Sequence, residues 1–408
     1  MKTNSHPFAR PFYVMLKPAG SRCNLACRYC YYMEKRHFFD ETADFCMSDD
    51  ILERFTQQYI EAQTTPDVLF TWHGGEPLLR PLQFYKKALE LQKRYAAGHH
   101  IDNCLQTNGT LLNDEWCEFL RDNNFLVGVS IDGPRHLHNI LRGNSFDKVM
   151  RGIELLDRYN VQWNAMATVN SANVGHPLEF YRFFKSIGCR YIQFTPIVER
   201  TDGMVATAID SNGEDEAEMM RKLSKESISS RQWGNFLCTV FSEWVRHDVG
   251  ETFVQLFDAT LANRVGVAPG ICSMAPTCGQ ATAMEFNGDM FCCDHFVFPE
   301  YRLGNIGDRS ITEMMLDKRL RHFGSAKRTS LPRQCRECRW LSLCNGECPK
   351  NRLLHDCYGE SGLNLLCEGY RRFFQHAAPA MDFMAQELAE GRAPANIIND
   401  SAMQKLYI

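Results

Sequence analysis

The sequence predicts an α/β fold in which a partial (βα)6 barrel is followed by a small cysteine-rich α+β domain. Through the first half of the 408-residue chain, short apolar runs alternate with longer amphipathic segments, which is typical of a parallel sheet with helical connections. Ten of the 18 cysteines lie between residues 272 and 367, where turn-forming residues replace long apolar segments. Cysteine ligands, rather than a large apolar core, are therefore expected to organise the second part.

Each strand of the predicted barrel precedes an amphipathic segment or a connector. The strands are expected at residues 13–17, 67–73, 101–106, 125–130, 161–169 and 191–197. The helices are expected at 49–62, 81–97, 113–124, 146–159 and 177–187, with Asn113 as the N-cap of the third. This order of elements indicates parallel strands in a partial TIM-like barrel.

Polar or glycine-rich clusters follow several of these strands: HGGEP at 73–77, QTNG at 106–109 and SIDG at 130–133. The carboxyl ends of parallel barrel strands meet at one edge, which is where such barrels bind their ligands. We therefore expect a ligand site at this edge.

The second half is expected to begin with a polar loop at 200–216 and helices at 217–229 and 232–247. A hairpin is predicted around Asn287-Gly288, a pair typical of type I′ turns. The expected domains are the barrel (1–200), a helical connector (201–267), the cysteine-rich domain (268–385) and a C-terminal tail (386–408).

Composition excludes several function classes. A net charge of −4 provides no basic field for nucleic acid. The first twenty residues contain only a short apolar run, too short for a signal peptide or a membrane span, so a cytoplasmic protein is expected. In a large chain of this kind, many cysteines indicate metal ligands or free thiols in a reducing compartment.

The segment CNLACRYC places Cys23, Cys27 and Cys30 in a C-x3-C-x2-C spacing. A structural zinc site has four ligands, so it would need Cys46 or His37 as well. A [4Fe-4S] cluster on three cysteines instead leaves one iron open to a small molecule that carries an amine and a carboxylate.

The same segment, with aromatic Tyr29 before its third cysteine, resembles the signature of radical S-adenosylmethionine enzymes. The resemblance implies that S-adenosylmethionine occupies the open iron position. It also implies that Gly75, in a GGEP motif, lies near the methionine amino group, although a plain strand-to-helix turn is the alternative.

Three further cofactor contacts follow from this resemblance. It places Ser130 and Arg142 against the ribose and carboxylate of the cofactor, and Val198 beside the adenine. The alternatives are a solvated helix-surface arginine and an ordinary core valine.

The C-terminal cysteines have the spacings C-x5-C-x14-C and C-x2-C-x5-C-x3-C, with one more cysteine beyond. Eight thiolates can fill two closed sites, each either [4Fe-4S] or zinc by spacing alone. Their order resembles the SPASM extension of peptide-modifying radical enzymes. This resemblance implies an auxiliary set I of Cys272, Cys278, Cys293 and Cys348, and an auxiliary set II of Cys335, Cys338, Cys344 and Cys367. A zinc ribbon remains the alternative for auxiliary set II.

Within that superfamily, the chain resembles the anaerobic sulfatase-maturating enzymes from about residue 12 to 385. The resemblance rests on Cys293-Asp294 after the hairpin, YRLGNI at 301–306 and CRWLSLCNGECP at 338–349. Two positions depart from the family: Glu347 stands where a glycine is usual, and His73 stands where a similar enzyme has glutamine.

The resemblance implies that a 5′-deoxyadenosyl radical oxidises a cysteine or serine of a sulfatase C/S-x-P-x-R segment to Cα-formylglycine. It implies three [4Fe-4S] clusters, a sulfatase polypeptide as substrate and an electron donor such as flavodoxin or ferredoxin. Asp294 is the predicted general base, and a solvated aspartate is the alternative. Another SPASM-type peptide modifier, such as a thioether-forming enzyme, and a noncatalytic iron–sulfur or zinc protein are the alternative functions.

Overall fold

The structure is a computed structural model that describes residues 11–39, 44–201 and 216–408. These residues form two compact units, each assembled from separate stretches of the chain. The first unit contains residues 1–129, 147–163 and 278–325, and the second contains 130–146, 164–277 and 326–408. The domain boundaries expected from the sequence remain a prediction.

The first unit has a mostly parallel sheet in the order β10-β9-β8-β1-β2-β3-β4. Its strands are β1 (Tyr13–Leu16), β2 (Asp67–Trp72), β3 (His100–Thr107), β4 (Leu126–Ser130), β8 (Ala281–Met284), β9 (Asp289–Phe291) and β10 (Arg302–Asn305). β8 runs parallel to β1, with Met15 opposite Ala283, and β9 and β10 complete an antiparallel extension. The first strand of the chain is therefore paired with a strand from its last third.

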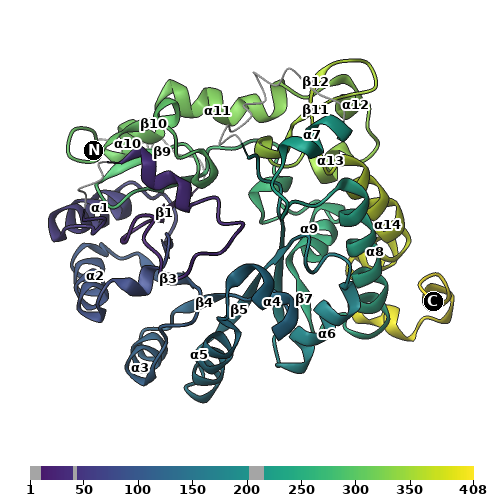
Figure 1. The fold of residues 1–408 in the computed structure, drawn as a ribbon, viewed down its shortest axis with the longest axis horizontal. Helices are drawn as coiled ribbons and strands as arrows, with labels where there is room; N and C mark the ends of the chain where they lie inside the picture. The colour runs from purple at the N-terminus through teal and green to yellow at the C-terminus, as the bar shows by residue number, and fades with distance from the viewer. Residues whose placement is uncertain (1–10, 40–43, 202–215) are drawn as a thin grey trace. The chain divides into compact units, whose positions relative to one another are not determined.

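Helices cover this sheet, as Figure 1 shows for the elements next to β1 to β4. They are α1 (Asp49–Glu61), α2 (Leu82–Tyr95), α3 (Asp114–Asp122), α5 (Phe146–Arg158) and α10 (Ile311–Met315), and α11 (Lys318–Thr329) continues into the second unit. Alternate residues of β2 are buried, and Phe70 and Trp72 pack against aromatic rings of α1 and α2. The predicted cap Asn113 accepts a hydrogen bond from the Trp116 N–H at 2.9 Å.

The second unit combines a short parallel sheet, β5 (Trp163–Val169), β6 (Tyr191–Pro196) and β7 (Phe253–Val254), with many helices. These are α4 (Arg135–Arg142), α6 (Pro177–Ser186), α7 (Glu216–Lys222), α8 (Ser230–His247), α9 (Gln255–Arg264), α12 (Arg333–Arg336), α13 (Leu341–Cys344), α14 (Cys367–Ala389) and α15 (Ser401–Lys405), with a hairpin of β11 (Leu354–His355) and β12 (Ser361–Leu363). α8 and α14 lie side by side in Figure 1. A Cβ on Gly234 would lie 2.9 Å from the Gly369 Cα, so glycine permits this close approach.

The structure contains each predicted strand and corrects three local expectations. α4 was not anticipated, and the helix expected at 217–229 ends at Lys222. The hairpin between β8 and β9 is present, but its turn is not type I′, because only Gly288 has a positive φ, of 85°, and Asn287 does not. The Gly288 N–H bonds to the Glu285 carbonyl, which leaves a three-residue loop with glycine at its left-handed position. Among the described residues, no helix is both long and apolar enough to cross a membrane.

Candidate active site

The cysteine loop of the first unit follows β1 and carries Cys23, Cys27 and Cys30, all half-buried. The Cys30 N–H bonds to the Cys27 carbonyl at 3.1 Å, which draws these two residues into one turn. The Cys23 sulfur accepts from the Leu25 N–H at 3.4 Å and from the Asn108 side-chain amide at 3.7 Å. Burial raises the pKa of Cys23, and the charges of Glu76 and then Cys30 add to this rise.

The GGEP turn after β2 holds the cysteine loop. The Gly75 N–H bonds to the Gly20 carbonyl at 2.8 Å, and the Glu76 N–H bonds to the Arg22 carbonyl at 2.8 Å. A Cβ on Gly75 would lie 2.0 Å from the Arg22 carbonyl oxygen, so only glycine fits here. The buried Glu76 carboxylate also accepts from the Asn108 N–H at 2.7 Å. These contacts hold the loop that carries the three thiols in place. Three thiols in one such loop fit the donor set of a three-cysteine cluster.

Three predicted cofactor contacts belong to the second unit, and the structure brings two of them together. Arg142 is buried, rather than solvated, at the end of α4. Its guanidinium donates to the Ser130 carbonyl at 3.2 Å and to the Asp132 carboxylate at 3.1 Å. Val198 is buried just beyond β6, and its carbonyl accepts from Lys350 at 2.6 Å. Their contacts with the cofactor remain a prediction.

Asp294 lies in a buried polar cluster of the first unit, not at a solvated position. It opens a short 3-10 turn directly after Cys293, and only 6% of the residue is exposed. The Lys17 ammonium forms an ion pair with Asp294 Oδ1, and the Tyr31 hydroxyl donates to Asp294 Oδ2. Lys17 and Tyr31 therefore orient the two carboxylate oxygens of Asp294.

Lys17 connects Asp294 to a second polar group. Its residue is 0% exposed, and its Nζ lies 2.9 Å from His73 Nδ1 and 4.3 Å from the centre of the Tyr32 ring. His73 Nδ1 also accepts from the Gly74 N–H at 2.8 Å. The Tyr32 hydroxyl in turn donates to the buried carboxylate of Glu285.

The charges in this cluster depend on one another. Burial alone would raise the pKa of Asp294, but the charge and hydrogen bond of Lys17, with the charges of His73 and His295, together outweigh burial and lower that pKa below its usual range. Burial, followed by the charge of Lys17, lowers the pKa of His73 to about 4, so His73 is neutral at pH 7. Burial raises the pKa of Glu285 to about 7. The arrangement thus favours Asp294 as the charged carboxylate, which can accept a proton.

Sequence reasoning found Asp294 but missed Lys17, Tyr31 and the Tyr32–Glu285 pair. Lys17 directly follows β1, at the carboxyl end of a parallel strand. Since barrel sites lie at this end, its place after the apolar run could have indicated a site residue. Glu285 carried no comparable signal, because it depends on how β8 pairs with β1. The Lys17 N–H bonds to the Met284 carbonyl at 2.9 Å across that pairing.

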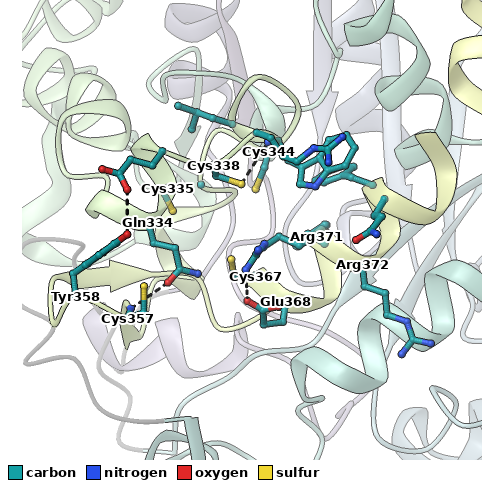
Figure 2. Close-up of a pocket in the computed structure, with 18 residues that line it drawn as sticks. Gln334, Cys335, Cys338, Cys344, Cys357, Tyr358, Cys367, Glu368, Arg371 and Arg372 are labelled. Atoms are coloured by element: carbon teal, nitrogen blue, oxygen red, sulfur yellow. Dashed lines mark hydrogen bonds and ion pairs between the residues drawn. The ribbon is translucent and has the colours of Figure 1, made fainter. Parts of the chain in front are cut away.

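The cysteines of auxiliary set II line one cavity of about 670 Å³ in the second unit (Figure 2). Burial raises the pKa of Cys335 to about 11 and that of Cys344 to about 12. Four thiols spread around a cavity, rather than converging on one point, fit a multi-atom iron–sulfur cluster better than a single zinc ion. Among the described residues, no three His, Cys, Asp or Glu side chains form a group that could hold one metal ion.

The cysteines of auxiliary set I are divided between the two units. Cys278 and Cys293 belong to the first unit, and Cys272 and Cys348 to the second. Lys327, buried in the second unit, donates to the Cys272 and Ser273 carbonyls at 2.7 Å each. The grouping of these four thiols remains a prediction.

Comparison with protein families identifies the class. Residues 18–184 match the family described as the radical SAM superfamily, and residues 276–339 match the family described as an iron–sulfur cluster-binding domain, SPASM. The fold and these matches define a radical S-adenosylmethionine enzyme with a C-terminal iron–sulfur domain. The predictions of fold class, S-adenosylmethionine and iron–sulfur clusters are confirmed.

Similar proteins identify the family. The chain is 58% identical to a serine-type anaerobic sulfatase-maturating enzyme of Bacteroides thetaiotaomicron, covering 98% of this chain and 97% of that one. It is 30% identical to a cysteine-type enzyme of Clostridium perfringens, covering 93% and 99%. A solved structure described as "Native anSMEcpe with bound AdoMet and Cp18Cys peptide" matches with a TM-score of 0.80 at 30% identity, covering 93% of this chain and 100% of that one. The chain belongs to the anaerobic sulfatase-maturating enzymes.

Proposed function

We propose that this enzyme oxidises the serine of a sulfatase S-x-P-x-R segment to Cα-formylglycine, and so activates the sulfatase. Family membership supports formylglycine formation, and it favours this reaction over thioether formation or a noncatalytic role. The identity of 58% to a serine-type relative, against 30% to a cysteine-type relative, supports serine as the preferred residue. The structural observation that carries the proposal is the buried Asp294 carboxylate, oriented by Lys17 and Tyr31.

The cofactor-binding residues prepare the reaction. Cys23, Cys27 and Cys30 would hold the cluster that binds S-adenosylmethionine, and the GGEP turn keeps their loop in place. Bound there and reductively cleaved, S-adenosylmethionine supplies a 5′-deoxyadenosyl radical that removes a hydrogen atom from the substrate Cβ. Tyr29, Gly75, Ser130, Arg142 and Val198 would hold the cofactor, while the protein supplies its position and excludes water.

Asp294 would complete the oxidation. After hydrogen abstraction, the substrate must lose one proton from its hydroxyl and one electron to become an aldehyde. The Asp294 carboxylate takes the proton, because its charged form is favoured by Lys17. One electron must also leave, and clusters held by the auxiliary cysteines, among them Cys293 directly before Asp294, would supply its acceptor. With a cysteine substrate, the same steps give a thioaldehyde, which water then hydrolyses.

The physiological setting follows from this chemistry. A newly made or unfolded sulfatase segment is the substrate, because the residue to be oxidised must reach the radical. Each turnover needs a low-potential reductant, for which flavodoxin or ferredoxin is the expected donor. We propose a cytoplasmic location, where such donors and reduced thiols occur.

Matched peptides test the proposed function. The full chain, reconstituted with iron and sulfide without oxygen, is incubated with S-adenosylmethionine, a reductant and peptides that differ only in Ser-x-Pro-x-Arg against Cys-x-Pro-x-Arg. We expect aldehyde formation by mass spectrometry, with a higher kcat/KM for the serine peptide. Aldehyde from the cysteine peptide alone would contradict the serine preference, and cofactor cleavage without aldehyde from either peptide would contradict the whole proposal.

Lys17→Met is expected to reduce aldehyde formation roughly 10- to 100-fold, since a hydrogen bond to a charged group contributes about 1.5 to 3 kcal/mol. Without the ammonium, burial favours the protonated form of Asp294, which accepts no proton. Initial rates across pH check this, and the loss should lessen as pH rises. Lys35→Met is the matched control, because buried Lys35 lies 3.3 Å from the Phe298 ring centre rather than beside Asp294. An equal loss in both variants would indicate a general packing defect.

A further inference from the structure

The turn between Cys344 and Cys348 has an unusual backbone. Asn345, Gly346 and Glu347 all have left-handed φ angles, of 48°, 70° and 51°. Glycine adopts this conformation freely and asparagine tolerates it, whereas glutamate adopts it seldom. A residue held in such a conformation persists only where its surroundings impose it, and such positions concentrate at functional sites. The side chain of Glu347 is therefore the part to explain.

Glu347 points its carboxylate into the protein rather than into solvent. Only 6% of the residue is exposed. Its Oε2 accepts from the Asn364 side-chain amide at 2.7 Å and from the Asn351 amide at 3.2 Å, and both asparagines are buried. Within residues 11–39, 44–201 and 216–408, no ion pair to Glu347 is formed. Burying a charged carboxylate that only neutral amides contact costs free energy, so a functional role for this charge is the feature to examine.

Glu347 lies between cysteines of both auxiliary sets. The Glu347 N–H bonds to the Cys344 carbonyl at 2.8 Å, and the next residue is Cys348. The two asparagines that hold its carboxylate contact cysteines of both sets as well. The Asn364 carbonyl accepts from the Cys367 N–H at 3.0 Å, and the Asn351 N–H bonds to the Cys348 carbonyl at 3.0 Å. One carboxylate is thus held among ligands of two predicted clusters.

Two buried cations border the same turn and donate to backbone carbonyls. Arg352 donates to the Gly346 and Asn345 carbonyls at 3.0 Å each and to the Lys327 carbonyl at 2.7 Å. A Cβ on Gly346 would lie 2.6 Å from the Arg352 guanidinium, so glycine is needed there. The Lys327 ammonium donates to carbonyl oxygens beside Cys272. The turn is held by carbonyl contacts, which leaves the Glu347 carboxylate to act through its field.

We propose that Glu347 sets the reduction potentials of the clusters on both auxiliary sets and makes both more negative. Each cluster gains one electron on reduction, with no bond made or broken, and a nearby carboxylate opposes the added negative charge. Buried charges are screened weakly, so the effect reaches ligands of both sets. Because both potentials shift in the same direction, the difference between them changes by less than the larger of the two shifts. The inference rests on the proposed function only through the assignment of these cysteines as cluster ligands.

Glu347→Gln tests this proposal, because glutamine keeps the shape and the oxygen acceptor while removing the charge. In the full chain reconstituted without oxygen, redox titration followed by electron paramagnetic resonance should show both auxiliary midpoint potentials shifted positive. The cluster on Cys23, Cys27 and Cys30 should keep its potential and serves as the internal reference. Glu368→Gln is the matched control, because Glu368 is exposed beside Cys367, where solvent screens its charge, and it should give a much smaller shift.

The outcomes separate charge from structure. Unchanged potentials in Glu347→Gln, with iron content intact, would overturn the proposal. If that variant loses iron, Glu347→Gly supplies the same measurement with the backbone strain removed, and it should show the same positive shift. A shift in Glu347→Gly alone, with Glu347→Gln normal, would assign a structural role and refute the proposal. A site that contains zinc would show no titration and would refute it for that site. The potentials are measured without substrate, so failure of the proposed function would not affect this test.

Discussion

Replacing Cys23, Cys27 and Cys30 together with alanine should abolish reductive cleavage of S-adenosylmethionine while the other two clusters remain. The three thiols sit in one loop that the GGEP turn holds in place, whereas the cysteines of auxiliary set II line a cavity in the other unit. Loss of one ligand set therefore leaves the other donors unaffected. Release of 5′-deoxyadenosine under reducing conditions measures the first effect, and Mössbauer spectra count the clusters that persist.

The control for this experiment is a variant that removes cysteines outside the predicted sets. Cys46 and Cys104 are half-buried members of the same unit, so Cys46→Ala with Cys104→Ala changes the thiol content and removes, at the loop, the contact of the Arg22 side chain with the Cys46 sulfur at 3.7 Å. This variant should cleave the cofactor normally. Loss of cofactor cleavage in this variant would instead support Cys46 as a fourth ligand of the first site. Continued release of 5′-deoxyadenosine by the alanine triple variant would show that the radical-generating cluster had been assigned to the wrong cysteines.

The sequence predicted features that depend on neighbouring residues. The strands were located because β2 alternates buried and more exposed residues over a few positions, and α3 because Asn113 is an effective cap. The ligand site could be predicted from the polar clusters that directly follow the strands, since the carboxyl ends of parallel strands share one edge. Gly75 was identified from the motif alone, although the structure shows that its first constraint is the backbone of Arg22.

The sequence could not predict features that depend on distant pairing. Lys17 meets Asp294 because β1 and β8 run in register, and no periodic pattern records which distant strands become neighbours. A surface position remained the alternative for Arg142, since its burial depends on Asp132 and on α4, a helix that the sequence analysis did not anticipate. The turn at Asn287-Gly288 follows the length of the loop between its strands, which overrides the preference of the dipeptide.

Asp294→Asn is expected to reduce formylglycine formation by about 10²- to 10⁴-fold, the usual cost of losing one positioned general base. Asparagine keeps the shape of the side chain and can still meet the Tyr31 hydroxyl, but it accepts no proton. Radical generation does not need that proton transfer. The variant should therefore still cleave S-adenosylmethionine, and the informative measurement is aldehyde formed per 5′-deoxyadenosine released.

The structure adds a necessary control to this prediction. Asp294→Asn leaves Lys17 as a buried cation without its carboxylate partner, and such a break can cost about 3 to 5 kcal/mol of stability. The double variant Lys17→Met with Asp294→Asn removes both charges, so it should recover stability without recovering aldehyde. Because Lys17 acts through Asp294, adding Lys17→Met to Asp294→Asn should lower the rate little further. A near-normal aldehyde yield from Asp294→Asn, with all three clusters intact, would remove Asp294 from the mechanism. Independent losses that multiply in the double variant would instead give Lys17 a role of its own in proton removal.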